Sequence, residues 1–86
     1  MKEIIKLSTP IQTNGTEECS LEMREPTVND ILAVQKATQV TMEQEVELCA
    51  NLCQIAPDSI RSLTFKDYRK LQKTLSKMMG DEIPLE

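Results

Sequence analysis

Closely spaced carboxylates are the first candidates for chemistry in this sequence. They occur at Glu17-Glu18 and at Glu43, Glu45 and Glu47, and we interpret them as exposed charge rather than as a catalytic dyad. General acid–base catalysis near neutral pH usually depends on histidine, and the 86 residues include none. Two glycines are too few for a phosphate-binding loop, and no Ser or Cys lies in a known nucleophile signature. We therefore predict no catalytic residues, no cofactor and no enzymatic activity.

The three cysteines are the next candidates, as metal ligands or redox groups. Cys49 and Cys53 are four residues apart in a predicted helix and would be stacked neighbours. With one further cysteine, Cys19, and no histidine, a zinc site would need carboxylates to complete its four ligands. We predict buried, reduced cysteines and no metal.

The last predicted helix carries chemistry suited to binding a partner. Its two faces are apolar (Tyr68, Leu71, Leu75, Met78, Met79) and basic (Lys66, Arg69, Lys70, Lys73, Lys77). Residues 61–77 hold six positive charges against Asp67 alone, although the whole chain has a net charge of −4. The sequence thus predicts a basic helix on an acidic body.

Three interpretations of this helix stay open. The basic face is a solvated surface whose cations suit the helix dipole, or it steers an acidic or amphipathic partner, or it binds nucleic acid. Nucleic acid is disfavoured because the chain is acidic and lacks aromatic stacking residues. As a hypothesis, Lys66, Lys70, Lys73 and Lys77 guide a partner while Leu75, Met78 and Met79 contact it.

The first quarter of the chain predicts a β-hairpin over about residues 4–24, because apolar and polar residues alternate on both sides of Asn14-Gly15. Asn-Gly suggests a two-residue loop, but such a loop would put the two apolar sets on opposite faces. We therefore predict a three-residue loop, Thr13-Asn14-Gly15, with Gly15 as a left-handed bulge. The predicted pairs are Leu7 with Leu21 and Ile5 with Met23, and Pro10 should lie on an edge.

The rest of the chain predicts helices at about 28–38, 42–54, 57–62 and 65–79, then a tail over 80–86. Three of these helices begin with a capping threonine and a polar residue three positions on, at Thr27 and Asp30, Thr41 and Gln44, and Thr64 and Asp67. The helix at 42–54 is apolar over most of its girth and should be central. The predicted fold is α+β, one domain over residues 1–86. No apolar run after Met1 suits a signal peptide or a membrane span, so we expect a cytoplasmic protein.

The order of several short motifs resembles one known family. The hairpin exit reads Leu21-Glu22-Met23-Arg24-Glu25-Pro26-Thr27-Val28-Asn29-Asp30. Glu45-Val46-x-Leu48, Ile55-Ala56-Pro57-Asp58-Ser59-Ile60-x-x-Leu63 and Asp67-Tyr68-x-x-Leu71-Gln72 follow. This pattern, over about residues 4–75, is similar to the tail assembly chaperones of the tail protein E family, from Mu-like and related contractile-tailed phages. Cys53-Gln54 departs from the usual Thr-Gly, which puts a tight turn there in doubt.

The resemblance implies a non-virion phage or prophage assembly factor in the cytoplasm of the bacterial host. Such proteins bind the tape measure protein, keep it soluble and help tail tube subunits polymerise around it. The alternatives are a structural minor tail or baseplate protein and a small nucleic-acid-binding regulator.

Overall fold

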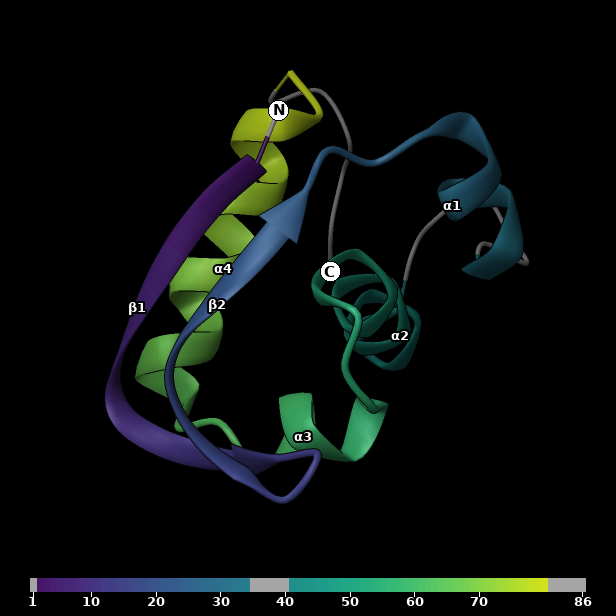
Figure 1. The fold of residues 1–86 in the computed structure, drawn as a ribbon. Coiled ribbons are helices and arrows are strands. Elements are labelled where there is room, and N and C mark those ends of the chain that lie inside the picture. The colour runs from purple at the N-terminus through teal and green to yellow at the C-terminus, as the bar shows by residue number, and fades with distance from the viewer. Residues whose placement is uncertain (1, 35–40, 81–86) are drawn as a thin grey trace.

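The structure is a computed structural model that describes residues 2–34 and 41–80. Its elements are β1 (Lys2–Thr13), β2 (Thr16–Arg24), α1 (Val28–Val34), α2 (Met42–Cys53), α3 (Pro57–Arg61) and α4 (Phe65–Met78). An antiparallel hairpin followed by helices confirms the predicted α+β class (Figure 1). The expected end of the first helix at residue 38 and the tail over 81–86 lie outside the described residues.

The hairpin turn is tighter than the sequence predicted. Asn14 and Gly15 form a two-residue loop with φ of 54° and 76°, the left-handed geometry that matches the twist of the flanking strands. Thr13 pairs with Thr16 directly across this loop. The predicted three-residue loop, with Gly15 as a bulge, is therefore wrong.

An irregularity in β1 explains why the predicted register also fails. Between Lys6 and Ile11, four residues of β1 face Cys19 alone in β2. The offset is three residues, an odd number, and successive side chains of a strand point to opposite faces. The offset therefore places the apolar residues of both strands on one face. The observed pairs are Ile5 with Leu21 and Glu3 with Met23, in place of Leu7 with Leu21 and Ile5 with Met23. Pro10 lies within the irregular segment, where its missing amide hydrogen breaks no ladder bond.

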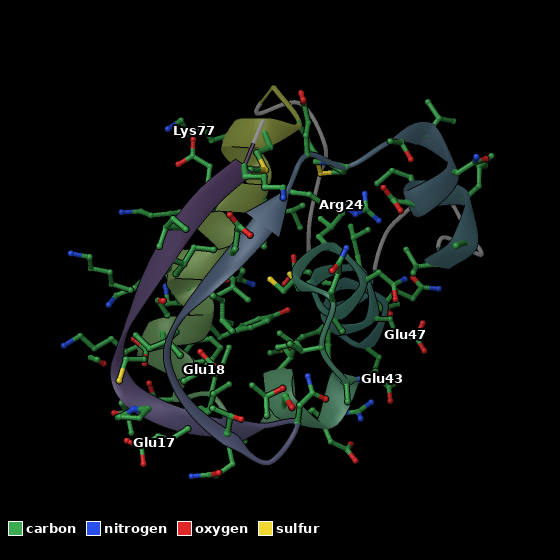
Figure 2. The ribbon with its side chains drawn as sticks, in the orientation of Figure 1. Glu17, Glu18, Arg24, Glu43, Glu47 and Lys77 are labelled. Carbon is green, nitrogen blue, oxygen red and sulfur yellow. The ribbon has the colours of Figure 1, made fainter. Side chains whose placement is uncertain are left out.

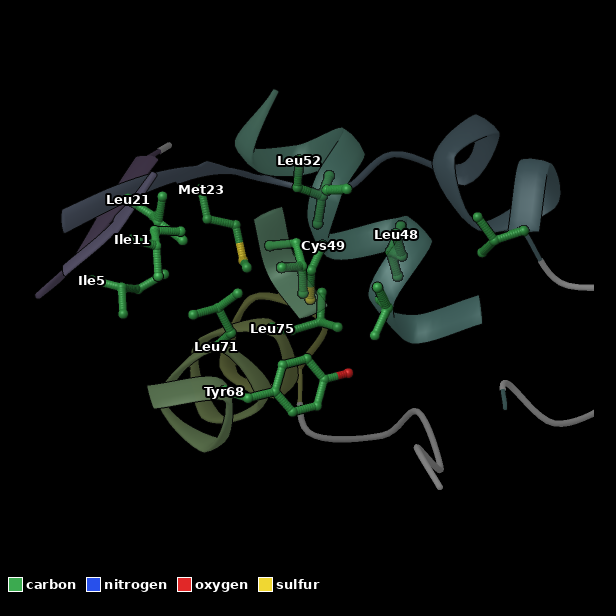
Figure 3. Packing of buried hydrophobic residues seen from close by; sticks show 14 residues of the cluster. Ile5, Ile11, Leu21, Met23, Leu48, Cys49, Leu52, Tyr68, Leu71 and Leu75 are labelled. Atoms are coloured by element: carbon green, nitrogen blue, oxygen red, sulfur yellow. The ribbon is translucent and has the colours of Figure 1, made fainter. Parts of the chain in front are cut away.

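The core lies between the inner face of the hairpin and helices α2 and α4 (Figure 3). As predicted, α2 supplies more buried residues than the other helices: Glu45, Val46, Leu48, Cys49, Ala50 and Leu52. From the hairpin and α4 come Ile5, Ile11, Leu21, Met23, Tyr68, Leu71 and Leu75. Each fully buried aliphatic side chain contributes roughly 1.5–3 kcal/mol of transfer free energy, so aliphatic packing carries the stability of a chain that buries one aromatic ring.

The predicted helix starts are present, with one difference. Thr41 and Gln44 form a complete capping box before α2, and Asp30 accepts hydrogen bonds from the backbone and hydroxyl of Thr27. The Thr64 hydroxyl accepts from the backbone amide of Asp67 at 3.3 Å. The Asp67 side chain, however, turns toward β1 instead of back to Thr64. At the start of α4, the threonine cap is therefore present, but the reciprocal hydrogen bond from the backbone of Thr64 to the Asp67 side chain is not.

Helix α2 ends one residue earlier than predicted, at Cys53. Gln54 adopts a left-handed conformation with φ of 59° and donates its backbone N–H to carbonyls of the last turn. A tight turn is therefore retained without glycine, at a backbone cost of roughly 1–2 kcal/mol.

Candidate partner-binding surfaces

The four predicted lysines follow one side of α4, but they are not equivalent. Lys70 donates to the backbone carbonyl of Lys6 at 2.9 Å and lies 3.3 Å from the Asp67 carboxylate. Lys77 lies 3.6 Å from the Glu3 carboxylate, and Figure 2 shows it at the end of α4 beside β1. Lys66 and Lys73 are exposed and form no ion pair with the residues that the structure describes. Two of the four lysines therefore fasten α4 to the hairpin, and two face solvent.

The three apolar residues predicted to contact a partner also separate. Leu75 is fully buried in the core, so its side chain is not available at the surface. Met78 and Met79 are half-buried and pack against the edge of the core. Only the two methionines could extend a binding surface without rearrangement of the core.

A buried carboxylate joins α4 to the irregular part of β1. The Asp67 side chain is fully buried and accepts hydrogen bonds from the backbone amides of Ser8 (3.0 Å) and Thr9 (3.1 Å) and from the Ser8 hydroxyl (2.9 Å). Burial acts to raise the pKa of this carboxyl, but these hydrogen bonds and Lys70 outweigh burial and hold the pKa well below its usual value. Asp67 thus satisfies amides that the strand ladder leaves free.

A second buried carboxylate corrects the reading of Glu45 as exposed charge. Glu45 has no exposed surface, and its Oε1 accepts from the Tyr68 hydroxyl and from Gln72 Nε2 (2.8 Å). Its Oε2 has no hydrogen-bond partner within residues 2–34 and 41–80. Burial and the Glu45 carboxylate raise the pKa of Tyr68, which keeps the phenol protonated as a donor. The network fixes α2 against α4. Glu43 and Glu47, by contrast, are exposed as predicted.

The hairpin exit is closed by a third polar contact. The Arg24 guanidinium donates two hydrogen bonds, of 2.7 and 2.8 Å, to the Asp30 carboxylate. The hydrogen bond to Arg24, followed by those from Thr27, holds the pKa of Asp30 well below its usual value. This paired geometry fixes the chain direction between β2 and α1.

The sequence analysis missed the buried roles of Glu45 and Asp67. Both residues belong to the short motifs that carry the family resemblance, as do Arg24, Asp30 and Tyr68. That shared membership is the signal that could have marked them. The contacts show that these motif residues hold the scaffold together and leave other residues to form the outer surface.

All three cysteines are free, and they differ in exposure. Cys49 is buried, and burial raises the pKa of its thiol. Burial raises the pKa of Cys53 to about 11. Cys19 is exposed, so the prediction of a buried side chain is wrong there, because it faces outward opposite the irregular segment of β1. The described part of the chain contains no group of three residues placed to hold a metal ion.

An apolar hollow that the sequence analysis did not predict lies between α2, α3 and α4. Met42 and Phe65, from the first turns of α2 and α4, are exposed by 48% and 58% and line a cavity of about 230 Å³ together with Val46, Ile60 and Tyr68. Exposed large apolar side chains that gather around one concavity are typical of interaction sites.

Comparison with known families decides which class of protein has this arrangement. The model of the family described as phage tail assembly chaperone proteins, E, or 41 or 14, matches residues 4–80. The chain belongs to this family. The match covers the hairpin from Ile4 onward and the four helices of the described chain, so the buried contacts described above are part of this chaperone's scaffold. No curated protein and no solved structure matches the chain. Within the residues described, no helix of this chaperone has the length and apolar character needed to span a membrane.

Proposed function

We propose that the protein binds the tape measure protein of its phage or prophage, keeps it soluble and aids assembly of the tail tube around it. It acts in the cytoplasm of the bacterial host, catalyses nothing and leaves before the particle is complete. The observation that carries this proposal is the family match over residues 4–80. The fully buried Asp67 and Glu45 support it, because their carboxylates serve packing and hydrogen bonding within the scaffold.

The outer side of α4 is the part of the predicted surface that suits the first encounter with a client. Lys66 and Lys73 present solvated charge there, and long-range attraction between such cations and acidic segments raises association rates. Met78 and Met79 lie at the C-terminal end of α4 and offer flexible apolar contact. Lys70 and Lys77 contribute charge from fixed positions beside β1.

Co-expression with the tape measure protein tests this proposal. The wild-type chain should move the tape measure protein into the soluble fraction and co-purify with it. The double variant Lys66→Glu and Lys73→Glu should reduce the co-purified amount several-fold without unfolding the chain, because both side chains lie in solvent. Substitution of all four lysines by glutamate is a less clean test, because Lys70 and Lys77 contact the hairpin and their loss could change the fold.

The control is Lys2→Glu with Lys6→Glu, which makes the same change in net charge on the exposed side of β1. Lys2 lies 3.9 Å from the exposed Glu22 carboxylate, and such a surface pair contributes at most about 1 kcal/mol. This control should co-purify as wild type. A tape measure protein that stays insoluble beside the wild-type chain would contradict the proposed function. Stoichiometric amounts of the chain in purified phage particles would instead favour a structural tail protein.

A further inference from the structure

We infer that the hollow between α2, α3 and α4 is a docking site for an amphipathic helix of a partner, with acidic residues along the side that faces α4. The apolar groove comprises Met42, Val46, Ile60, Leu63, Phe65 and Tyr68. The inference deepens the proposed function, because it takes this helix to belong to the client. It also places the client's apolar contact at these six residues, apart from Met78 and Met79 at the C-terminal end of α4.

The shape and composition of the apolar groove fit a buried row of aliphatic side chains. Its volume is about 230 Å³, and Arg61 is the only charged residue that lines it within the part of the chain described. Five large apolar residues of the described chain are strongly exposed, and two of them, Met42 and Phe65, meet here from different helices. The others, Ile4, Val28 and Leu32, do not line it. An amphipathic helix offers residues at i, i+3, i+4 and i+7 to such a groove.

The exposed anchors of the apolar groove are held in place before any partner binds. Met42 and Phe65 are the first residues of α2 and α4, and each directly follows a threonine that caps its helix. Tyr68 is buried and lines the groove, and the hydrogen bond from its hydroxyl to Glu45 fixes the ring. Phe65 and Tyr68 lie 6.3 Å apart between ring centroids. Such preorganisation lowers the entropic cost of binding.

The charges around the apolar groove indicate which partner it suits. On the α4 side, the Arg69 guanidinium lies 5.9 Å from the centroid of the Phe65 ring, and Lys66 and Lys73 follow on the exposed surface. On the other side, Glu43 and Glu47 line an adjoining hollow with Arg61, and Figure 2 shows both carboxylates beside α2. The rim is therefore positive toward α4 and negative toward α2. An acidic flank on the partner helix is complementary to the α4 side, and the carboxylates on α2 disfavour nucleic acid.

A defined probe tests the inference with the full chain. The probe is a fluorescent synthetic helix that has leucines at i, i+4, i+7 and i+11, glutamates on one flank and lysines on the other. Its binding is followed by fluorescence anisotropy. We expect Phe65→Ala and Met42→Ala each to weaken binding about tenfold or more, as truncation of a central anchor does. A second probe with lysines on both flanks should also bind about tenfold more weakly than the first.

Leu32→Ala is the matched control, because Leu32 is exposed by 68% on α1 and does not line the apolar groove. It should bind as wild type, and all three variants should keep the wild-type circular dichroism spectrum. Binding of Phe65→Ala and Met42→Ala within twofold of wild type would overturn the inference. So would a wild-type dimer that Phe65→Ala converts to monomer in sedimentation, because a second copy would then occupy the groove.

The two proposals fail in different ways. If Phe65→Ala with Met42→Ala solubilises the tape measure protein as well as wild type does, the docking site is wrong and the proposed function stands. If the wild-type chain does not solubilise that protein, the proposed function fails whatever the peptide results show.

Discussion

At the scale of single residues, the structure depends on two carboxylates that the sequence presents as ordinary charge. Glu45 and Asp67 have no exposed surface; Glu45 accepts hydrogen bonds from two donors and Asp67 from three. A buried acceptor that keeps its donors contributes modestly, whereas removal of the acceptor leaves those donors unsatisfied at about 1–3 kcal/mol each. Removal of either carboxylate should therefore destabilise the fold mainly because its donors are left buried without an acceptor.

Glu45 allows a test of this asymmetry. Glu45→Ala should lower the free energy of unfolding by about 2–4 kcal/mol, because Tyr68 and Gln72 lose their acceptor and a cavity remains. Glu45→Gln keeps an acceptor oxygen for both donors and should change stability by less than about 1.5 kcal/mol. Urea unfolding measures both values.

Glu47→Ala, an exposed carboxylate two residues along the same helix, serves as the control and should stay within about 0.5 kcal/mol of wild type. Equal effects for Glu45→Ala and Glu47→Ala would show that Glu45 is not buried as described.

At the scale of elements, α4 and the hairpin determine each other's position. The free amides of Ser8 and Thr9 arise because β1 carries extra residues opposite Cys19, and Asp67 is the acceptor that the described structure supplies for them. Periodicity, capping residues and Pro57 predicted both strands and the four described helices. They did not predict the register, because the register depends on this contact between residues 59 positions apart. The alternation rule assumed a regular ladder, and a tertiary hydrogen bond stabilises the irregular one.

The depressed pKa of Asp67 predicts an acid-sensitive junction. A carboxyl whose folded pKa lies below its unfolded value, about 3.9, stabilises the fold fully above that value and loses its contribution as pH falls through the folded pKa. Asp67→Asn should therefore be less stable than wild type at pH 7 by about 2–4 kcal/mol. This difference in the free energy of unfolding should become smaller below about pH 4. Urea unfolding from pH 7 to pH 2.5 measures this.

The control for this junction is Asp58→Asn, whose side chain is 94% exposed beside Arg61. It should cost less than about 1 kcal/mol at pH 7, as for other surface ion pairs. The free energies of unfolding of wild type and Asp67→Asn could instead differ by the same amount at pH 2.5 as at pH 7. That result would contradict a buried carboxylate held ionised by the Ser8 and Thr9 amides.

At the scale of the whole molecule, the fold separates scaffold from surface. The motif residues that carry the family resemblance, such as Arg24, Asp30 and Asp67, hold the elements together from within. Exposed cations on α4 and the exposed Met42 and Phe65 are left to meet other molecules.

The sequence predicted the class of fold and the basic side of α4, because both follow from local periodicity. It did not predict the apolar groove, whose residues come from α2, α3, α4 and the connection between α3 and α4 and are brought together by packing. Nor did it predict the burial of Leu75, which faces the core from the helix whose other side is basic.

The central proposal, that this chain works by contact alone, predicts a fixed stoichiometry. Tape measure protein is diluted from denaturant into buffer with increasing amounts of the purified chain and no nucleotide, and aggregation is followed by light scattering. We expect scattering to fall in proportion to the chain added and to reach its minimum at a fixed ratio of bound chains per client. Complete suppression of aggregation by much less than one chain per client molecule would show that each chain acts on many clients in turn. That result would contradict stoichiometric binding.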